Sequence, residues 1–142
     1  RHTVKTRVAV DERTGRFVDI CGDAVGPFAD LTPLEASGLG RRLPAGVGLL
    51  GDLAYVGAGR LHREGLAATP RRKPRGRPRP AEDVAFNRAF ARRRVAVEHR
   101  IGRLRTYQAL AQVDRHRRRH HGRRVAAVAG LLNRQLAEPE VA

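Results

Sequence analysis

Two carboxylates in this sequence stand where side chains often bind a divalent cation. Asp52 follows the apolar run 47–50 after one glycine, and this run predicts a buried strand that ends in a carboxylate. Glu98 belongs to a long helical pattern and lies about a quarter turn from the centre of its apolar stripe, at the border of the core. Mg²⁺ accepts one or two carboxylates and keeps water or phosphate oxygens as its other ligands. Asp52 and Glu98 are therefore candidate metal ligands.

Arginines surround the second acid. Arg94 lies four residues before Glu98 and Arg105 lies seven residues after it, so the helical period places the three side chains on one face. Cations in this arrangement can hold a phosphate backbone beside the acid. In the structural alternative, Asp52 caps a turn at its strand end and Glu98 forms a surface ion pair with Arg94. Spacing alone favours this alternative over a metal site.

The N-terminal segment predicts a β-hairpin. Residues 3–10 alternate polar and apolar side chains, residues 11–15 supply turn chemistry, and residues 16–21 return to β-prone sequence. A loop is expected over 22–27.

A short helix is predicted next. Thr32 supplies a capping hydroxyl, Pro33 suits the first helical position, and Glu35 completes a capping box. The helix is expected to stop at Gly38 or Gly40.

Two amphipathic helices are predicted in the second half. The first runs from residue 82 to about residue 113, and its apolar stripe consists of Phe86, Phe90, Val97, Ile101 and Leu104. The second covers 123–136, with a stripe of Val125, Val128, Leu131 and Leu132. A His/Arg run over 115–124 separates them, and its charge favours contact with phosphate.

The charge is concentrated in one segment. The 142 residues carry 29 Lys and Arg against 14 Asp and Glu, and residues 60–124 hold 21 of these bases and 5 of the acids. This charge block favours a nucleic acid as partner, with an anionic membrane surface or a solvated face without a partner as alternatives. Two Tyr and four Phe are too few for a base-stacking platform, which favours a duplex backbone.

Residues 70–80, PRRKPRGRPRP, form the most biased stretch within this block. They contain four of the eight prolines and, apart from these, no apolar side chain, so an extended basic loop is expected. Its charge favours contact with DNA over the alternative role of a rigid spacer.

Composition excludes several classes of protein. A single cysteine excludes a disulfide framework and any cysteine-based zinc module. No apolar run reaches the roughly 18 residues of a membrane-spanning helix. We therefore expect a soluble, intracellular protein with one domain at most.

Four segments carry a resemblance to bacterial insertion-sequence transposases of the DDE type. The opening RHTVKTRVAVDERTGRFVDI resembles the family's Lys-Arg-His-Thr-x-Lys stretch and hairpin. The segment GPFADLTPLEASGL is similar to its Gly-x-x-His-Asp-x-x-x-Leu loop, with Asp30 at the Asp and Ala29 at the His. GDLAYVG resembles the Asp-x-Gly-Tyr-x-Gly box and places Asp52 at the second catalytic Asp. FNRAFARRRVAVEHRIGRLRTYQAL resembles the C-terminal signature, whose Arg, Glu and Lys/Arg fall on Arg94, Glu98 and Arg105.

Besides Ala29, the chain departs from the family pattern at three places. Ala91 stands where a Tyr is common, three residues before the signature Arg, and Ala54 replaces the Gly of the second box. The family's first catalytic Asp lies on a strand before the hairpin, and the chain begins after that point. The chain is therefore expected to be a fragment.

The resemblance implies a mixed α/β fold, a partial ribonuclease-H-like architecture with hairpin, short helix, buried strand and long C-terminal helices but without the first strand. Residues 1–142 would be one truncated catalytic domain. Its segments would be 1–59 with the Asp52 strand, the basic loop 60–81, and the helices 82–137 with Glu98. Because the missing strand would lie centrally in the sheet, poor solubility is expected of the isolated chain.

The resemblance also implies a function, the cleavage and strand transfer of DNA at the ends of a mobile element through two-metal carboxylate chemistry. Asp52 and Glu98 would be the catalytic residues and the ligands of Mg²⁺ or Mn²⁺. The residues in contact with DNA would be Arg92, Arg93, Arg94, Arg103 and Arg105. Two metals need a bridging carboxylate, which the missing Asp would supply, so the isolated chain is expected to be inactive.

The expected partners are transposon ends and target DNA, with no membrane, and a homodimer of the full-length protein. The expected location is the bacterial cytoplasm, in association with the nucleoid. Two alternatives stay open: a non-catalytic basic nucleic-acid-binding protein and a decayed transposase remnant.

Overall fold

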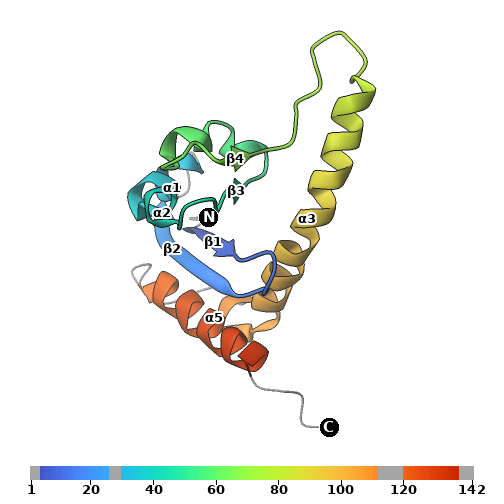
Figure 1. Ribbon diagram of the computed structural model, residues 1–142. Coiled ribbons are helices and arrows are strands. Elements are labelled where there is room, and N and C mark those ends of the chain that lie inside the picture. The colour runs from blue at the N-terminus through green and yellow to red at the C-terminus, as the bar shows by residue number, and fades with distance from the viewer. Residues whose placement is uncertain (1–3, 26–29, 112–119, 138–142) are drawn as a thin grey trace. The chain divides into compact units, whose positions relative to one another are not determined.

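The computed structural model describes residues 4–25, 30–111 and 120–137 and has the expected mixed α/β composition. The chain divides into two compact units (Figure 1). Unit 1 comprises Arg1–Phe28 and Ala96–Ala142, and unit 2 comprises Ala29–Val95. Among the described residues, no helix is long and apolar enough to cross a membrane.

The predicted hairpin is confirmed in unit 1. Strand β1 (Val4–Val10) pairs antiparallel with β2 (Phe17–Val25). Asp11 organises the turn, because its Oδ1 accepts the backbone N–H groups of Arg13 at 2.8 Å and Thr14 at 3.0 Å. These hydrogen bonds lower the pKa of Asp11.

The loop predicted over 22–27 is wrong for residues 22–25, which belong to β2, while residues 26 and 27 lie outside the described part of the chain. The strand continues because the first residues of β1 offer it a partner: Val4 lies opposite Val25 and Lys5 opposite Ala24. Periodicity within one strand carries no information about the length of the other strand.

A bulge in β2 decides which side chains enter the core. Val10 lies opposite Phe17 but Ala9 lies opposite Asp19, so Val18 is an extra residue in β2. In a regular strand Phe17 and Asp19 would share a face. The bulge instead lets Phe17 pack in the core while Asp19 forms an ion pair with Arg7, a pair with side-chain exposures of only 12% and 5%.

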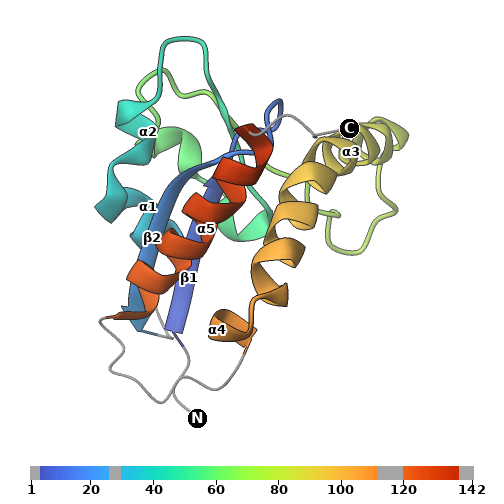
Figure 2. The same ribbon diagram turned by 90° about the horizontal axis from the view of Figure 1, so that it is seen from below.

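Helix α5 (His121–Ala137) packs against β2 and covers one face of the hairpin (Figures 1 and 2). The buried core cluster of unit 1 consists of Phe17, Leu104, Val125, Val128, Ala129 and Leu132. The stripe predicted for this helix is confirmed except at Leu131, which is 56% exposed. Ala129, 1% exposed, lies on the buried face instead, because an alanine allows the helix to approach the strand closely.

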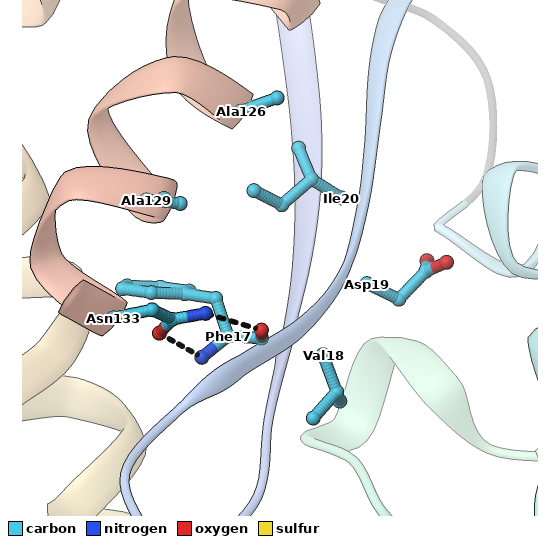
Figure 3. Close-up of a pocket in the computed structure, with 8 residues that line it drawn as sticks. Phe17, Val18, Asp19, Ile20, Ala126, Ala129 and Asn133 are labelled. Carbon is cyan, nitrogen blue, oxygen red and sulfur yellow. Dashed lines mark hydrogen bonds between the residues drawn. The ribbon is translucent and has the colours of Figure 1, made fainter. Parts of the chain in front are cut away.

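The backbone of β2 makes two direct contacts with α5, one at each end of their interface. A Cβ at Gly22 would lie 2.4 Å from the Cα of Gly122, so the strand and the helix cross here without side chains between them. At the other end, the Asn133 side chain accepts the N–H of Phe17 and donates to its carbonyl, both at 2.8 Å (Figure 3). Between these points an open groove of about 330 Å³ follows the small side chains of α5.

Unit 2 begins with two short helices, α1 (Leu31–Ser37) and α2 (Leu39–Arg42). The start predicted at Thr32 is wrong, because Asp30 is the N-cap residue and Thr32 lies in the first turn. Pro33 fits there since the first-turn N–H groups have no partner within the helix. The predicted stop at Gly38 is confirmed: its φ is 64° and its N–H donates to the carbonyl of Glu35 at 3.0 Å.

The strand predicted over 47–50 is shorter and less buried than expected. β3 (Leu49–Leu50) pairs in parallel with β4 (Ala67–Ala68), and both of its residues are half-buried. Val47 is 44% exposed and lies outside the strand. With only two residues in β4, the ladder has no partner for a longer strand.

A buried histidine holds the segment between β3 and β4. His62 is 7% exposed, and its Nε2 lies 2.8 Å from the carbonyl oxygen of Val47. Its Nδ1 accepts the N–H groups of Glu64 at 3.0 Å and Leu66 at 3.1 Å. Because Nδ1 receives two donors, the proton must be on Nε2, which donates to Val47. This neutral imidazole joins the segments on either side of the 3-10 turns η1 (Leu53–Tyr55) and η2 (Ala58–Leu61).

Every residue of the basic segment 71–80 is exposed, and the segment contains neither helix nor strand, which confirms the predicted loop. Helix α3 (Ala81–Thr106) follows it and ends earlier than predicted, before the short helix α4 (Gln108–Ala111). At the break, the Thr106 hydroxyl donates to the carbonyl of Arg103 at 2.8 Å and competes with helix continuation. Residues 112 and 113, and residues 115–119 of the His/Arg run, lie outside the described part of the chain.

The apolar stripe of α3 contains a residue that periodicity missed. Phe90 and Leu104 are buried as predicted, and Phe86, Val97 and Ile101 are half-buried. Arg100 lies on this stripe and is 7% exposed. It donates to the carbonyl of Leu132 at 3.2 Å, and its guanidinium carbon lies 5.4 Å from the ring centroid of Phe17. Burial lowers the pKa of Arg100.

Replacing Asn133 should destabilise unit 1. Asn133→Ala leaves the N–H and the carbonyl of Phe17 without their partners, at an expected cost of about 1–3 kcal/mol. Chemical denaturation followed by far-UV circular dichroism measures the loss. Gln135→Ala, an exposed change on the same helix, is the matched control. Equal stability of the two variants would contradict this role of Asn133.

His62→Ala should destabilise unit 2 by about 2–4 kcal/mol, because two N–H groups and one carbonyl lose a buried partner. The same denaturation experiment applies, with His99→Ala on the exposed surface of α3 as the control, which should stay within about 0.5 kcal/mol of the parent chain. A His62 variant as stable as the control would show that water replaces the imidazole without cost.

Candidate active site

Asp52 is positioned by the end of β3 and the turn that follows it. The N–H of Gly51 donates to the carbonyl of Ala68 at 3.0 Å and so extends the pairing with β4. Asp52 then caps η1: its Oδ1 accepts the N–H of Ala54 at 2.8 Å, and its carbonyl accepts the N–H of Tyr55 at 3.0 Å. The turn fixes the carboxylate where the strand ends.

Gly51 is required by the tightness of this turn. A Cβ at Gly51 would lie 2.5 Å from the Cβ of Tyr55 and 3.0 Å from its Cγ. No other residue could occupy this position without moving Tyr55 or the backbone. The close approach of Tyr55 therefore explains why a glycine precedes Asp52, which the sequence alone did not show.

Asp52 is half-buried, and its carboxylate uses one oxygen for the cap. Within residues 4–25, 30–111 and 120–137, its other oxygen accepts no hydrogen bond and Asp52 forms no ion pair. The turn-capping alternative is thus confirmed as a structural role. It leaves one oxygen able to act as a hard ligand for a cation.

Ala54 departs from the glycine of the family's second box, yet it preserves the cap. Its contribution to Asp52 is a backbone N–H, which every residue except proline supplies. The replacement therefore leaves the orientation of the Asp52 carboxylate intact.

Glu98 is exposed on α3, so its predicted place at the border of the core is wrong. The buried side of the helix in unit 1 is set by Arg100 and Leu104, and this turns Glu98 toward solvent. Asp52 belongs to unit 2 and Glu98 to unit 1. Neither candidate ligand is buried. Both are carboxylates, which are ligands that Mg²⁺ and Mn²⁺ accept.

The arginines predicted to contact DNA all lie on α3. Arg94 is half-buried, and the exposed members are Arg92, Arg93, Arg103 and Arg105. Arg94, Glu98 and Arg105 all belong to the continuous helix α3. Their spacings of four and seven residues place them on the same side of this helix. In the described segments, no group of three or more His, Cys, Asp or Glu side chains is close enough to hold a metal.

Comparison with known proteins gives a family for this chain. Residues 1–133 match the family model described as DDE superfamily endonuclease. Over 136 residues, 96% of its length, the chain is 30% identical to a protein of Microchaete diplosiphon named as a probable transposase for insertion sequence element IS702. The chain spans about half, 48%, of that relative. No solved structure gives a significant match. Since the family model covers nearly the whole chain, the protein belongs to the DDE superfamily of endonucleases.

Proposed function

We propose that this chain is part of a transposase that cleaves DNA and joins strands at the ends of a mobile element. The proposal rests on Asp52, which the resemblance places at the family's second catalytic Asp. One of its oxygens is held by the η1 cap, and the other accepts no hydrogen bond from the described residues. The relative from Microchaete diplosiphon supports the same role by its name. The proposed substrates are transposon ends and target DNA.

The proposed architecture is a ribonuclease-H-like catalytic domain, to which residues 1–142 contribute the hairpin, the Asp52 strand and the C-terminal helices. Its support is the order of elements: an antiparallel hairpin, helices, the short parallel pair β3 and β4, and then long helices. The proposed full-length protein acts as a homodimer.

DDE superfamily endonucleases generally use divalent metals. We assign Asp52 and Glu98 as ligands of Mg²⁺ or Mn²⁺, whose chemistry when bound is to lower the pKa of a water or hydroxyl and to stabilise a leaving oxygen. The role of Asp52 is to present a carboxylate oxygen that the turn holds in place. The role of Arg94 and Arg105 is to hold a DNA phosphate beside Glu98, with Arg92, Arg93 and Arg103 along the same helix.

A non-catalytic nucleic-acid-binding protein is the second candidate, because residues 60–124 hold 21 bases against 5 acids. In that case Asp52 is only the cap of η1 and Glu98 only a surface acid, as in a decayed transposase. The two candidates differ in whether Asp52 binds a metal, which the next experiment measures.

Asp52→Asn should weaken Mn²⁺ binding to the 142-residue chain by about tenfold or more, because an amide carries no charge for the cation. The Asn oxygen can still accept the N–H of Ala54, so the fold should persist. Isothermal titration with MnCl₂ measures the affinity. Asp11→Asn is the matched control, since Asp11 also accepts backbone N–H groups in an exposed turn. Equal affinities for the two variants would favour the non-catalytic alternative.

The isolated 142-residue chain should not cleave DNA. Two of the three carboxylates expected for two-metal chemistry match its residues, and a bridging ligand between two metals is needed for in-line attack. Incubation with supercoiled plasmid and Mg²⁺ or Mn²⁺ tests this, with nicking read on a gel. Nicking that Asp52→Ala abolishes would overturn the prediction of inactivity while supporting the assignment of Asp52.

A further inference from the structure

The segment that the proposed active site leaves unused is the exposed basic loop, residues 72–79. It contains five cations and no acid: Arg72, Lys73, Arg75, Arg77 and Arg79. Every residue from 71 to 80 is exposed, so these side chains are not used to build a core. Figure 1 shows the loop extending past the first turn of α3.

The residue before the basic loop is fixed to α3 by four contacts. The side chain of Asn87 accepts the N–H of Arg71 at 2.8 Å and donates to its carbonyl at 3.0 Å. The Arg71 guanidinium forms an ion pair with Asp83 at 2.8 Å and lies 4.6 Å from the ring centroid of Phe86. Asn87 pairs both backbone groups of Arg71, so this residue is held although it belongs to none of the described strands.

The residue after the basic loop is fixed as well. The carbonyl of Pro80 accepts the N–H groups of Asp83 and Val84, both at 3.1 Å, which makes Pro80 the start of α3. Both ends of the loop are therefore attached to the first two turns of one helix. Within the loop, Pro74 and Pro78 restrict φ and keep the chain extended, and Gly76 makes the turn with φ 72°.

We propose that the basic loop, held by Arg71 and Asn87, binds the phosphate backbone of duplex DNA. Each of the five cations can neutralise a phosphate, and the attachment of both loop ends reduces the conformational entropy that is lost on binding. The scarcity of aromatic residues in the chain favours a duplex over single strands. The choice of DNA among polyanions rests on the proposed function.

The experiment compares two variants of the 142-residue chain with equal charge. The loop variant carries Arg72→Gln, Lys73→Gln, Arg75→Gln, Arg77→Gln and Arg79→Gln. The control variant removes five exposed arginines elsewhere: Arg13→Gln, Arg16→Gln, Arg41→Gln, Arg63→Gln and Arg123→Gln. Fluorescence anisotropy with a labelled duplex of arbitrary sequence, in EDTA and over a series of salt concentrations, gives the affinity and its salt dependence. Far-UV circular dichroism checks that each variant keeps its helices.

The loop variant should reduce the slope of log affinity against log salt by about 3–5, because each lost phosphate contact removes about 0.9. The control variant should reduce the slope by less than about 1. Equal losses in the two variants would overturn the proposal and attribute binding to net charge. Loop-dependent binding to phosphatidylserine vesicles without loop-dependent binding to the duplex would also overturn it, in favour of a membrane surface.

A third variant tests the attachment rather than the charge. Asn87→Ala keeps every cation but frees Arg71, so the affinity should fall about three- to tenfold while the salt slope stays near that of the parent chain. An unchanged affinity would show that the attachment plays no part in binding. Because EDTA removes metals, these measurements are independent of the Asp52 titration, and either proposal can fail alone.

Discussion

The hairpin of unit 1 depends on helix α5, because two strands alone cannot bury an apolar face and are marginally stable in water. Val8, Val10, Phe17 and Ile20 present their side chains to one face, and α5 covers it. The close crossing of Gly22 and Gly122 and the Asn133 amide set the position of the helix along the strand. These partners are about a hundred residues apart in the chain, so the contact joins the two ends of unit 1.

Arg100 shows how the candidate catalytic helix is oriented. Its guanidinium is buried between the ring of Phe17 and the last turns of α5, where it donates to the carbonyl of Leu132. A buried cation is costly unless hydrogen bonds and aromatic faces compensate it, so the position is specific. Because Arg100 points into the core, Glu98, two residues earlier, is turned to the opposite side and exposed. The orientation of the proposed metal ligand thus follows from packing on the other face of α3.

In unit 2, backbone hydrogen bonds rather than a large core position Asp52. β3 and β4 share only two residue pairs, and the segment between them is held by the His62 imidazole. Asp52 is itself part of this network through the cap of η1. The turn-capping role and the proposed metal role therefore do not exclude each other: the cap uses one oxygen and fixes the direction of the other.

Local sequence determined the features whose causes are local. The hairpin, the stop of α1 at Gly38, the basic loop and the two long helices follow from turn residues, a left-handed glycine, prolines and helical periodicity. The family, too, could be predicted from the four segments that resemble its motifs, and the family model confirms it. Tertiary structure alone decided the bulge at Val18, the exposure of Leu131 and the burial of Arg100 and His62. Each of these depends on a partner distant in the sequence, and periodicity along one segment cannot say which polar group will find a buried partner or which apolar one will not.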